Sequence, residues 1–405
     1  MRELPVPAFK LRNARQSEMY SEALAWEPAS ALVRLVDVLM PPDLGLQFDL
    51  VTGRAEGTPH RSGEFSIPLH YRYADDPPEA RRPAVLRLYV NADPKLLWKN
   101  LPSDTADPFW KPDEAEQTLV GPLRRVVAAR KRGRSHAHVG SCCDDDFLIH
   151  HDIDGDWYVG IVADGAGSAQ FSRRGSQLAV RAAGAHVKQA LAGEAGEKVA
   201  AAVLAVQEAA SDEAASHARR VLQNALYVVV GHAAYMAMRA LVDEAQACSD
   251  RISAVKELAT TLLIGVARKF GTQWLCAAYW VGDGAVGVYR RDQSVELLGE
   301  VDAGEYSGQT RFLDKNEVTQ EALNKRTRFT LCDDFTAFVL MTDGVSDPKF
   351  ETEARLANLD AWNALWEDLE ANAGLAGAAQ GQKLLDWLDF WSQGNHDDRT
   401  IAIIY

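Results

Sequence analysis

Apolar and polar positions follow different periods in the first three parts of the chain. Over Ser17–Met40 the apolar residues recur at helical spacing and stop before two prolines, which predicts a helical segment within residues 1–40. Residues 41–100 contain short runs of β-formers separated by Gly, Pro, Asn and Asp, which predict a small antiparallel β domain. Residues 101–135 are first rich in Asp and Pro and then in arginine, which indicates a linker. Its basic residues can bind phosphate, although such runs are more often solvated connectors.

Residues 136–405 mix both patterns. The predicted strands are Trp157–Ala163, Thr260–Arg268, Gln273–Val281, Ala285–Arg290, Phe335–Met341 and Arg399–Tyr405. The predicted helices fall within Gly175–Leu191, Lys198–Ala247, Leu359–Ala371 and Gly381–Trp391. Because strands and helices come in runs, we expect a layered α+β domain and not a parallel βαβ fold. The most apolar stretch, Ala225–Met238, is too short to cross a bilayer and is predicted to be a buried helix.

The composition narrows the choice of partner and compartment. The formal net charge is −14, which argues against a nucleic acid as the main partner, because nucleic acids bind clustered positive charge. Five cysteines without metal-type spacing indicate a reducing compartment. The first residues lack the apolar core of a signal peptide. We therefore expect a cytoplasmic protein with no nucleic-acid or membrane partner.

Aspartates stand where predicted strands begin or end. They are Asp144, Asp145 and Asp146, then Asp164, Asp283 and Asp343, and finally Asp397 and Asp398. Taken singly, an aspartate beside glycine is a common turn residue. Their recurrence at several strand termini favours convergence on one cleft, where the negative charge would require cations. Because carboxylate oxygens are hard ligands, the expected cations are Mn²⁺ or Mg²⁺.

Six short motifs, in order along the chain, carry a family resemblance. They are GRSHAHVGSCCDDDF at 133–147, ADGAGSA at 163–169, ATT at 259–261, VGDG at 281–284, TDGVSD at 342–347 and HDDRT at 396–400. In these motifs the chain resembles the metal-dependent serine/threonine protein phosphatases of type 2C, most of all their bacterial branch. The resemblance implies that residues 136–405 form a four-layer αββα sandwich, in which two antiparallel sheets are flanked by helices.

A second resemblance concerns the β-rich region. The stretch PPDLGLQFDLVTGRAEGTPHRSGEFSIPLHYRY, residues 41–73, is similar to an immunoglobulin-like repeat. It implies that residues 41–100 form a small β-sandwich domain ahead of the phosphatase domain. A structural or docking role without chemistry is the simpler interpretation of such a domain.

The type 2C resemblance assigns metal ligands by position. It implies that Asp164 bridges two metal ions and that Gly165 offers its backbone carbonyl to the second ion. Asp343 and Asp397 would complete the shell of the first ion. Alignment on the threonine of HDDRT favours Asp397, and Asp398 is the alternative ligand.

The same resemblance implies further ligands and a mechanism. Asp145 matches a ligand that acts through water, whereas Asp283 and Asp347 match positions that bind a weaker third metal in several members. The implied cofactors are therefore two or three Mn²⁺ or Mg²⁺ ions. The implied reaction is direct attack on phosphorus by a water that bridges two metals, without a phosphoenzyme. Asp164, Asp145 and His136 are the catalytic candidates.

Two departures from the family pattern concern the proton donor and a phosphate-binding arginine. Ala166 replaces a histidine that many members carry, so a metal-bound water or His136 would have to donate the proton. His136 is equally well explained as a structural histidine. Gly140 stands where many members have arginine. The candidate substitutes are Arg134, Arg173 and Arg174, which can also be solvated, and Ser168 is assigned to substrate binding with the last two.

These features predict a phosphatase that hydrolyses phosphoserine or phosphothreonine in another protein. Its partners would be that phosphoprotein and, in signalling, a cognate serine/threonine kinase. One alternative is a catalytically weak phosphatase fold that binds a phosphoprotein or kinase, which Ala166 and Gly140 favour. Another is a hydrolase of small phosphate esters on the same metal centre.

Overall fold

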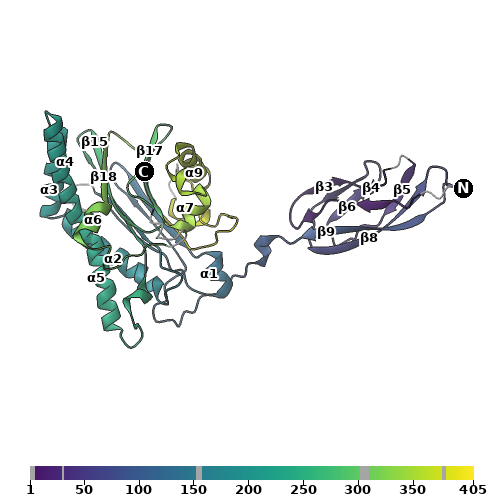
Figure 1. Ribbon diagram of the computed structural model, residues 1–405, viewed down its shortest axis with the longest axis horizontal. Coiled ribbons are helices and arrows are strands. Elements are labelled where there is room, and N and C mark those ends of the chain that lie inside the picture. The colour runs from purple at the N-terminus through teal and green to yellow at the C-terminus, as the bar shows by residue number, and fades with distance from the viewer. Residues whose placement is uncertain (1–4, 30–31, 152–156, 302–309, 376–379) are drawn as a thin grey trace. The chain divides into compact units, whose positions relative to one another are not determined.

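The chain divides into two compact units, Met1–Lys99 and Asn100–Tyr405. The computed structural model describes residues 5–29, 32–151, 157–301, 310–375 and 380–405, and Figure 1 shows both units as ribbons. Each unit has its own hydrophobic core.

The first unit is built from strands. They are β1 (Ala8–Lys10), β2 (Ala14–Arg15), β3 (Tyr20–Ala23), β4 (Ala25–Glu27), β5 (Val33–Val38), β6 (Leu46–Asp49), β7 (Arg54–Gly57), β8 (Gly63–Tyr73) and β9 (Arg82–Asn91), followed by a short 3₁₀ turn at Pro94–Leu97. One sheet has the order β4-β1-β9-β8-β5, with β2 also on β9, and the other has the order β3-β7-β6. Residues of both sheets share one core, so this unit is a small β-sandwich. It includes residues before position 41, where the expected domain began.

The predicted helical segment within residues 1–40 is wrong. Ser17–Met40 contains β3, β4 and β5, and β3 pairs with β7 while β5 pairs with β8. These partner strands lie farther along the chain, so the helical spacing of the apolar residues could not reveal them. Long-range pairing and burial on a sheet face override a weak local period.

The second unit contains two antiparallel sheets. The strands of the first are β10 (Glu114–Val120), β11 (Arg125–Lys131), β16 (Ala285–Arg290), β17 (Ser294–Leu297), β19 (Ala337–Met341) and β20 (Arg399–Ile404). Those of the second are β12 (Asp146–His151), β13 (Tyr158–Ala163), β14 (Leu262–Phe270), β15 (Gln273–Val281) and β18 (Thr327–Cys332). Their orders are β10-β11-β20-β19-β16-β17 and β12-β13-β14-β15-β18.

Helices cover the outer face of each sheet. They are α1 (Arg134–Val139), α2 (Ser172–Leu191), α3 (Glu194–Gln207), α4 (Asp212–Leu226), the π-helical turn η2 (Tyr227–Gly231), α5 (His232–Ala247), η3 (Val255–Leu258), α6 (Gln320–Arg326), α7 (Asp343–Phe350), α8 (Glu353–Leu356), α9 (Leu359–Asn372) and α10 (Gln380–Trp387). Figure 1 shows α2 to α5 on one side of the sheets and α7 and α9 on the other. The expected four-layer αββα sandwich is confirmed.

The predicted linker at residues 101–135 is also wrong. It contains β10 and β11, and β11 pairs with β20 inside the first sheet. The side chains of Val126, Val127, Ala128 and Ala129 are fully buried. These four apolar residues stand between arginines, and the charge of the flanks concealed a core strand. Arg130 itself is 4% exposed, so this basic run is no solvated connector.

The helix Asp212–Ala247, which comprises α4, η2 and α5, is long and apolar enough to cross a membrane. Half of the most apolar 18-residue stretch of this helix is buried inside the unit. Leu226, Val229, Val230, Ala233 and Ala234 are inaccessible to solvent and pack in the core beneath the second sheet. This agrees with the prediction of a buried helix, but the argument from length is wrong, because the stretch Ala225–Met238 continues into a longer helix at both ends.

We predict that residues 100–405 fold alone, whereas residues 133–405 do not. The shorter piece lacks β11, whose buried apolar residues contribute at least about 5 kcal/mol, an amount close to the whole stability of many domains. Circular dichroism melting of both truncations checks this. A cooperative transition of the shorter piece at the temperature of the longer one would contradict the assignment of β11 to the core.

Candidate metal centre

Three aspartates converge from separate parts of the second unit. Asp164 directly follows β13, Asp283 lies in the turn between β15 and β16, and Asp343 begins α7 just after β19. One carboxylate oxygen from each lies within 4.8 Å of the other two. The strands fix the backbone at these positions, so the ligand geometry rests on a rigid scaffold.

Asp145 adds a fourth carboxylate to this cluster. Its side chain is fully buried, and its Oδ2 accepts a hydrogen bond of 2.9 Å from the hydroxyl of Thr342. Its Oδ1 and the Oδ1 of Asp343 are both buried without a hydrogen-bond partner among the residues that the structure describes. A buried carboxylate oxygen without a donor is costly, and a cation satisfies it.

The carboxylates raise one another's pKa. Burial, followed by the charges of Asp343 and Asp145, raises the pKa of Asp164 well above its ordinary value. Burial and the charge of Asp283 do the same for Asp343, while burial and the charge of Asp398 raise the pKa of Asp145 to about 7. A set of hard oxygen donors that resists ionisation in the absence of cations fits Mg²⁺ or Mn²⁺.

The ATT motif holds the backbone of Asp164. The carbonyl oxygen of Asp164 accepts hydrogen bonds of 2.8 Å from the amide of Thr261 and from the hydroxyl of Thr260. The hydroxyl of Thr261 accepts a hydrogen bond of 2.9 Å from the amide of Asp164. At Gly165, a Cβ would lie 2.7 Å from the carbonyl oxygen of Asp144, so only glycine fits there.

The two candidates at the last motif have different surroundings. Asp398 is 2% exposed, and its carboxylate accepts hydrogen bonds of 2.6 Å from the amides of Gly133 and Asp144. Its Oδ2 also lies 3.1 Å from Nδ1 of His136. The side chain of Asp397 is 48% exposed, and its pKa is raised by burial, by Asp398 and by Asp283. Asp398 is therefore held by two backbone amides and by His136. Asp397 as the metal ligand, with Asp398 as the alternative, stays a prediction.

His136 forms the other half of this structural pair. Its Nδ1 lies 2.8 Å from the carbonyl oxygen of Cys142 and its Nε2 lies 3.7 Å from Asp397. Burial alone would lower the pKa of His136, but the hydrogen bond and charge of Asp398 raise it to about 10. The imidazolium therefore offsets part of the negative charge at the edge of the cluster.

Asp347 lies one turn along α7 from Asp343. Partial burial and the charges of Asp283 and Asp397 raise its pKa to about 6, which places it within the field of the cluster. The hydroxyl of Thr310 donates a hydrogen bond to Asp283. These contacts are compatible with the further metal position expected for Asp283 and Asp347, and that assignment stays a prediction.

A buried lysine supports the cluster from a segment that was expected to be part of a linker. Nζ of Lys111 lies 2.5 Å from the carbonyl oxygen of Asp145, 3.2 Å from the carboxylate of Asp146 and 3.3 Å from the hydroxyl of Ser176. Nε of Arg130 lies 3.3 Å from the same carboxylate. A single lysine in a stretch rich in Asp and Pro gave no signal of this role in the sequence.

The arginines predicted to bind substrate are engaged with other residues. Arg173 donates a hydrogen bond to Asp107, and Nε of Arg174 donates one of 2.6 Å to Glu244. Arg134 donates a hydrogen bond of 2.9 Å to the carboxylate of Asp389. Ser168 is exposed in the turn that follows Gly165. Substrate binding by Arg173, Arg174 and Ser168 remains a prediction without direct support from these contacts.

Comparison with known proteins identifies the family. A family model described as protein phosphatase 2C matches residues 132–389, which is more than half of the chain. The chain therefore belongs to the protein phosphatase 2C family. Membership supports a serine/threonine phosphatase function, dependence on metal and a phosphorylated protein as substrate.

Solved structures of similar proteins include three with coverage of almost their whole length. RsbX in complex with magnesium is 14% identical, with a TM-score of 0.35, and the match covers 72% of this chain and 98% of RsbX. Serine/threonine phosphatase Stp1 from Staphylococcus aureus is 13% identical, with a TM-score of 0.34 and coverage of 75% and 96%. Serine-threonine phosphatase 2C from Toxoplasma gondii is 14% identical, with a TM-score of 0.41 and coverage of 73% and 99%. No curated protein sequence matches the chain.

The raised pKa values predict how stability depends on pH. The carboxyl groups of Asp144 and Asp347, with pKa values of about 6, and of Asp145, with about 7, bind protons in the folded state above their ordinary pKa of 3.8. Folded protein therefore holds more protons than unfolded protein between about pH 4 and 7, and the free energy of unfolding falls as pH rises through this window.

Thermal melting in EDTA should show a lower Tm at pH 8 than at pH 5, and Mn²⁺ should restore most of the loss at pH 8, because cations bind the ionised carboxylates. The raised pKa of His136 acts in the same direction at higher pH. A metal-free Tm that rises from pH 5 to pH 8 would contradict the crowding of these carboxyl groups.

We also predict opposite phenotypes for neighbouring substitutions. Asp398→Asn removes the charge that faces His136 and should lower the free energy of unfolding by about 3–5 kcal/mol, the usual cost of breaking a buried ion pair. Asp397→Asn should leave the metal-free Tm unchanged or higher and weaken Mn²⁺ binding. Denaturant unfolding and calorimetric titration measure the two effects. Weaker metal binding by Asp398→Asn alone, at full stability, would reverse the assignment.

Proposed function

We propose that this protein is an active metal-dependent phosphatase that hydrolyses phosphoserine or phosphothreonine in another protein. The observation that carries the proposal is the convergence of Asp164, Asp283 and Asp343 on one point, with buried oxygens of Asp145 and Asp343 lacking hydrogen-bond partners among the described residues. Such an arrangement is stabilised when cations bind, and a fold without a metal function has no use for it.

In this proposal the ligand roles divide between the core and the edge of the cluster. Asp164, Asp343 and Asp397, with the carbonyl of Gly165, would hold two Mn²⁺ or Mg²⁺ ions, and Asp145, fixed by its hydrogen bond with Thr342, would act through water. When bound, these cations would supply an activated water for direct attack on phosphorus and neutralise charge on the phosphoryl oxygens.

The leaving oxygen needs a proton, and position 166 does not supply one. Ala166 is 4% exposed, and its amide donates a hydrogen bond of 3.0 Å to the carbonyl oxygen of Ala259, so this position supplies no acid. Because its pKa is about 10, His136 keeps a proton on Nε2 at neutral pH, close to Asp397. We assign it as the donor. Without any general acid the rate would be lower by about 10²–10⁴.

A second function is favoured by the same position. Ala166 in place of a histidine, together with the pairing of Arg173 to Asp107 and of Arg174 to Glu244, favours a catalytically weak module that binds a phosphoprotein or a kinase. This second function uses the same metal centre but predicts tight Mn²⁺ binding without hydrolysis of phosphopeptides. Turnover of phosphopeptides therefore decides between the two functions.

The free cysteines, the net charge and the buried apolar helix bear on the cellular setting. All five cysteines are free, which supports a reducing compartment, and we propose a cytoplasmic signalling protein that opposes a serine/threonine kinase. The net charge of −14 supports a protein partner over a nucleic acid. We propose no membrane partner, because the apolar helix Asp212–Ala247 is half buried in the core.

Asp164→Asn should abolish hydrolysis of a phosphothreonine peptide and of an aryl phosphate, because it removes the carboxylate proposed to bridge the cations, and it should preserve the fold. The measurement is phosphate release in Mn²⁺, with EDTA as the metal-free arm. Asp75→Asn, an exposed aspartate of the first unit, is the matched control and should retain full activity. Turnover that survives both Asp164→Asn and EDTA would exclude the proposed metal centre.

A further inference from the structure

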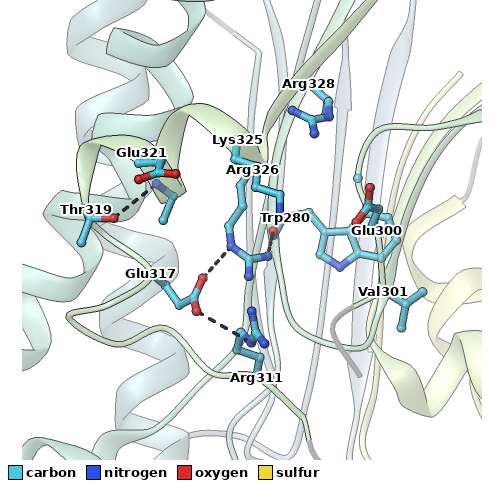
Figure 2. A pocket seen from close by; sticks show the side chains of 12 residues that line it. Trp280, Glu300, Val301, Arg311, Glu317, Thr319, Glu321, Lys325, Arg326 and Arg328 are labelled. Atoms are coloured by element: carbon cyan, nitrogen blue, oxygen red, sulfur yellow. Dashed lines mark hydrogen bonds and ion pairs between the residues drawn. The ribbon is translucent and has the colours of Figure 1, made fainter. Parts of the chain in front are cut away.

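A pocket lies beside the carboxylate cluster in the unit Asn100–Tyr405. It is a cavity of about 430 Å³ between the end of β15, the segment 311–319, helix α6 and the start of β18 (Figure 2). Three arginines, Arg311, Arg326 and Arg328, line it together with Lys325 and Trp280. We call this cavity the arginine pocket.

One carboxylate of the wall is already shared by two of these arginines. Nε of Arg326 donates a hydrogen bond of 2.7 Å to Glu317, and its Nη1 donates one of 3.0 Å to the carbonyl oxygen of Trp280. Nε of Arg311 lies 3.8 Å from the other oxygen of Glu317, and the Arg311 side chain is 45% exposed. Figure 2 shows both guanidinium groups directed at this carboxylate. Among the described residues, the carboxylate of Glu317 thus contacts two guanidinium groups.

The other two cations have no such partner. Within the described part of the chain, neither Lys325 nor Arg328 forms an ion pair, and the hydrogen bond of Arg328 goes to the carbonyl oxygen of Thr327 at 3.3 Å. Two further carboxylates, Glu300 and Glu321, are exposed. Figure 2 shows Glu321 beside Thr319. Among the residues that the structure describes, the wall therefore holds four cations and three carboxylates, in a chain whose overall charge is strongly negative.

The pocket and the metal centre share a wall. The segment 310–313 contacts the metal centre on both sides of Arg311, since the hydroxyl of Thr310 donates to Asp283 and the amide of Leu313 donates a hydrogen bond of 2.8 Å to the carbonyl oxygen of Thr260. On the opposite wall, Trp280 precedes Asp283 by three residues. Three residues span at most about 10 Å of chain.

We propose that the arginine pocket is a specificity subsite, which binds an acidic side chain of the protein substrate near the phosphorylated residue. An extended peptide advances about 3.3 Å per residue, so a glutamate or aspartate two to four residues from the phosphorylated position covers the span between the two sites. The carboxylate of the substrate pairs with Arg328, Lys325 and the exposed part of Arg311. This inference rests on the proposed phosphatase function and adds a preference among phosphoproteins.

The test compares three phosphothreonine peptides. They differ only at the positions two to four residues before and after the phosphothreonine, which carry glutamate in one peptide, alanine in the second and lysine in the third. The pocket variant is Lys325→Glu/Arg328→Glu. The matched control is Arg219→Glu/Arg220→Glu on α4, where the described residues include no ion-pair partner for either arginine. An aryl phosphate without flanking residues reports the metal centre alone.

Wild-type protein should prefer the glutamate peptide, and the pocket variant should raise its KM for that peptide by about 3- to 10-fold, as expected for losing exposed ion pairs. Its kcat, and its activity on the alanine peptide and the aryl phosphate, should change less than about 2-fold, because neither of these substrates places a carboxylate in the pocket. The α4 control should keep the wild-type preference.

Several results would overturn the inference and leave the proposed function standing. They are equal KM values of wild type for the three peptides, preference for the lysine peptide, or an equal loss in the α4 control. Failure of the proposed function looks different, because the aryl phosphate then also stays intact in Mn²⁺. In that case fluorescence anisotropy of the labelled peptides decides, and the subsite requires tighter binding of the glutamate peptide that Lys325→Glu/Arg328→Glu removes.

Discussion

Mutual repulsion among buried carboxylates is the constraint around which the second unit is organised. Asp145, Asp164 and Asp343 each have a pKa above the ordinary value, because burial and neighbouring charge both disfavour ionisation. Such a cluster persists in a folded protein only if protons or cations neutralise it. The metal requirement of the family is therefore a property of the apo fold as much as of the reaction.

The surrounding structure supports these carboxylates through hydrogen bonds and ion pairs from neighbouring segments. Thr260 and Thr261 fix the backbone of Asp164, Lys111 binds the carbonyl of Asp145, and the pair of His136 with Asp398 positions the turn that carries Asp397. All of these contacts join segments distant in the chain. Removal of one therefore affects stability and metal affinity together, which is typical of second-layer partners of metal sites.

Two features bear on proton transfer and on substrate choice in our proposals. Ala166 removes an acid from the centre of the site, which shifts proton transfer to His136 in our proposal. The arginine pocket provides positive charge next to an acidic centre, where long-range repulsion would otherwise oppose an acidic substrate.

The sequence alone determined the α+β class, most strands of the second unit and the aspartates of the centre, because motifs at strand ends and strong periodicity are local signals. Prediction from the sequence failed where long-range contacts decide the local structure. Residues 17–40 became strands because their partners lie elsewhere in the chain, and β11 was hidden because its arginines suggested solvent. Only the tertiary structure could show that Asp398 is held by backbone amides and reveal the role of Lys111, since burial and hydrogen bonding depend on packing that no local pattern encodes.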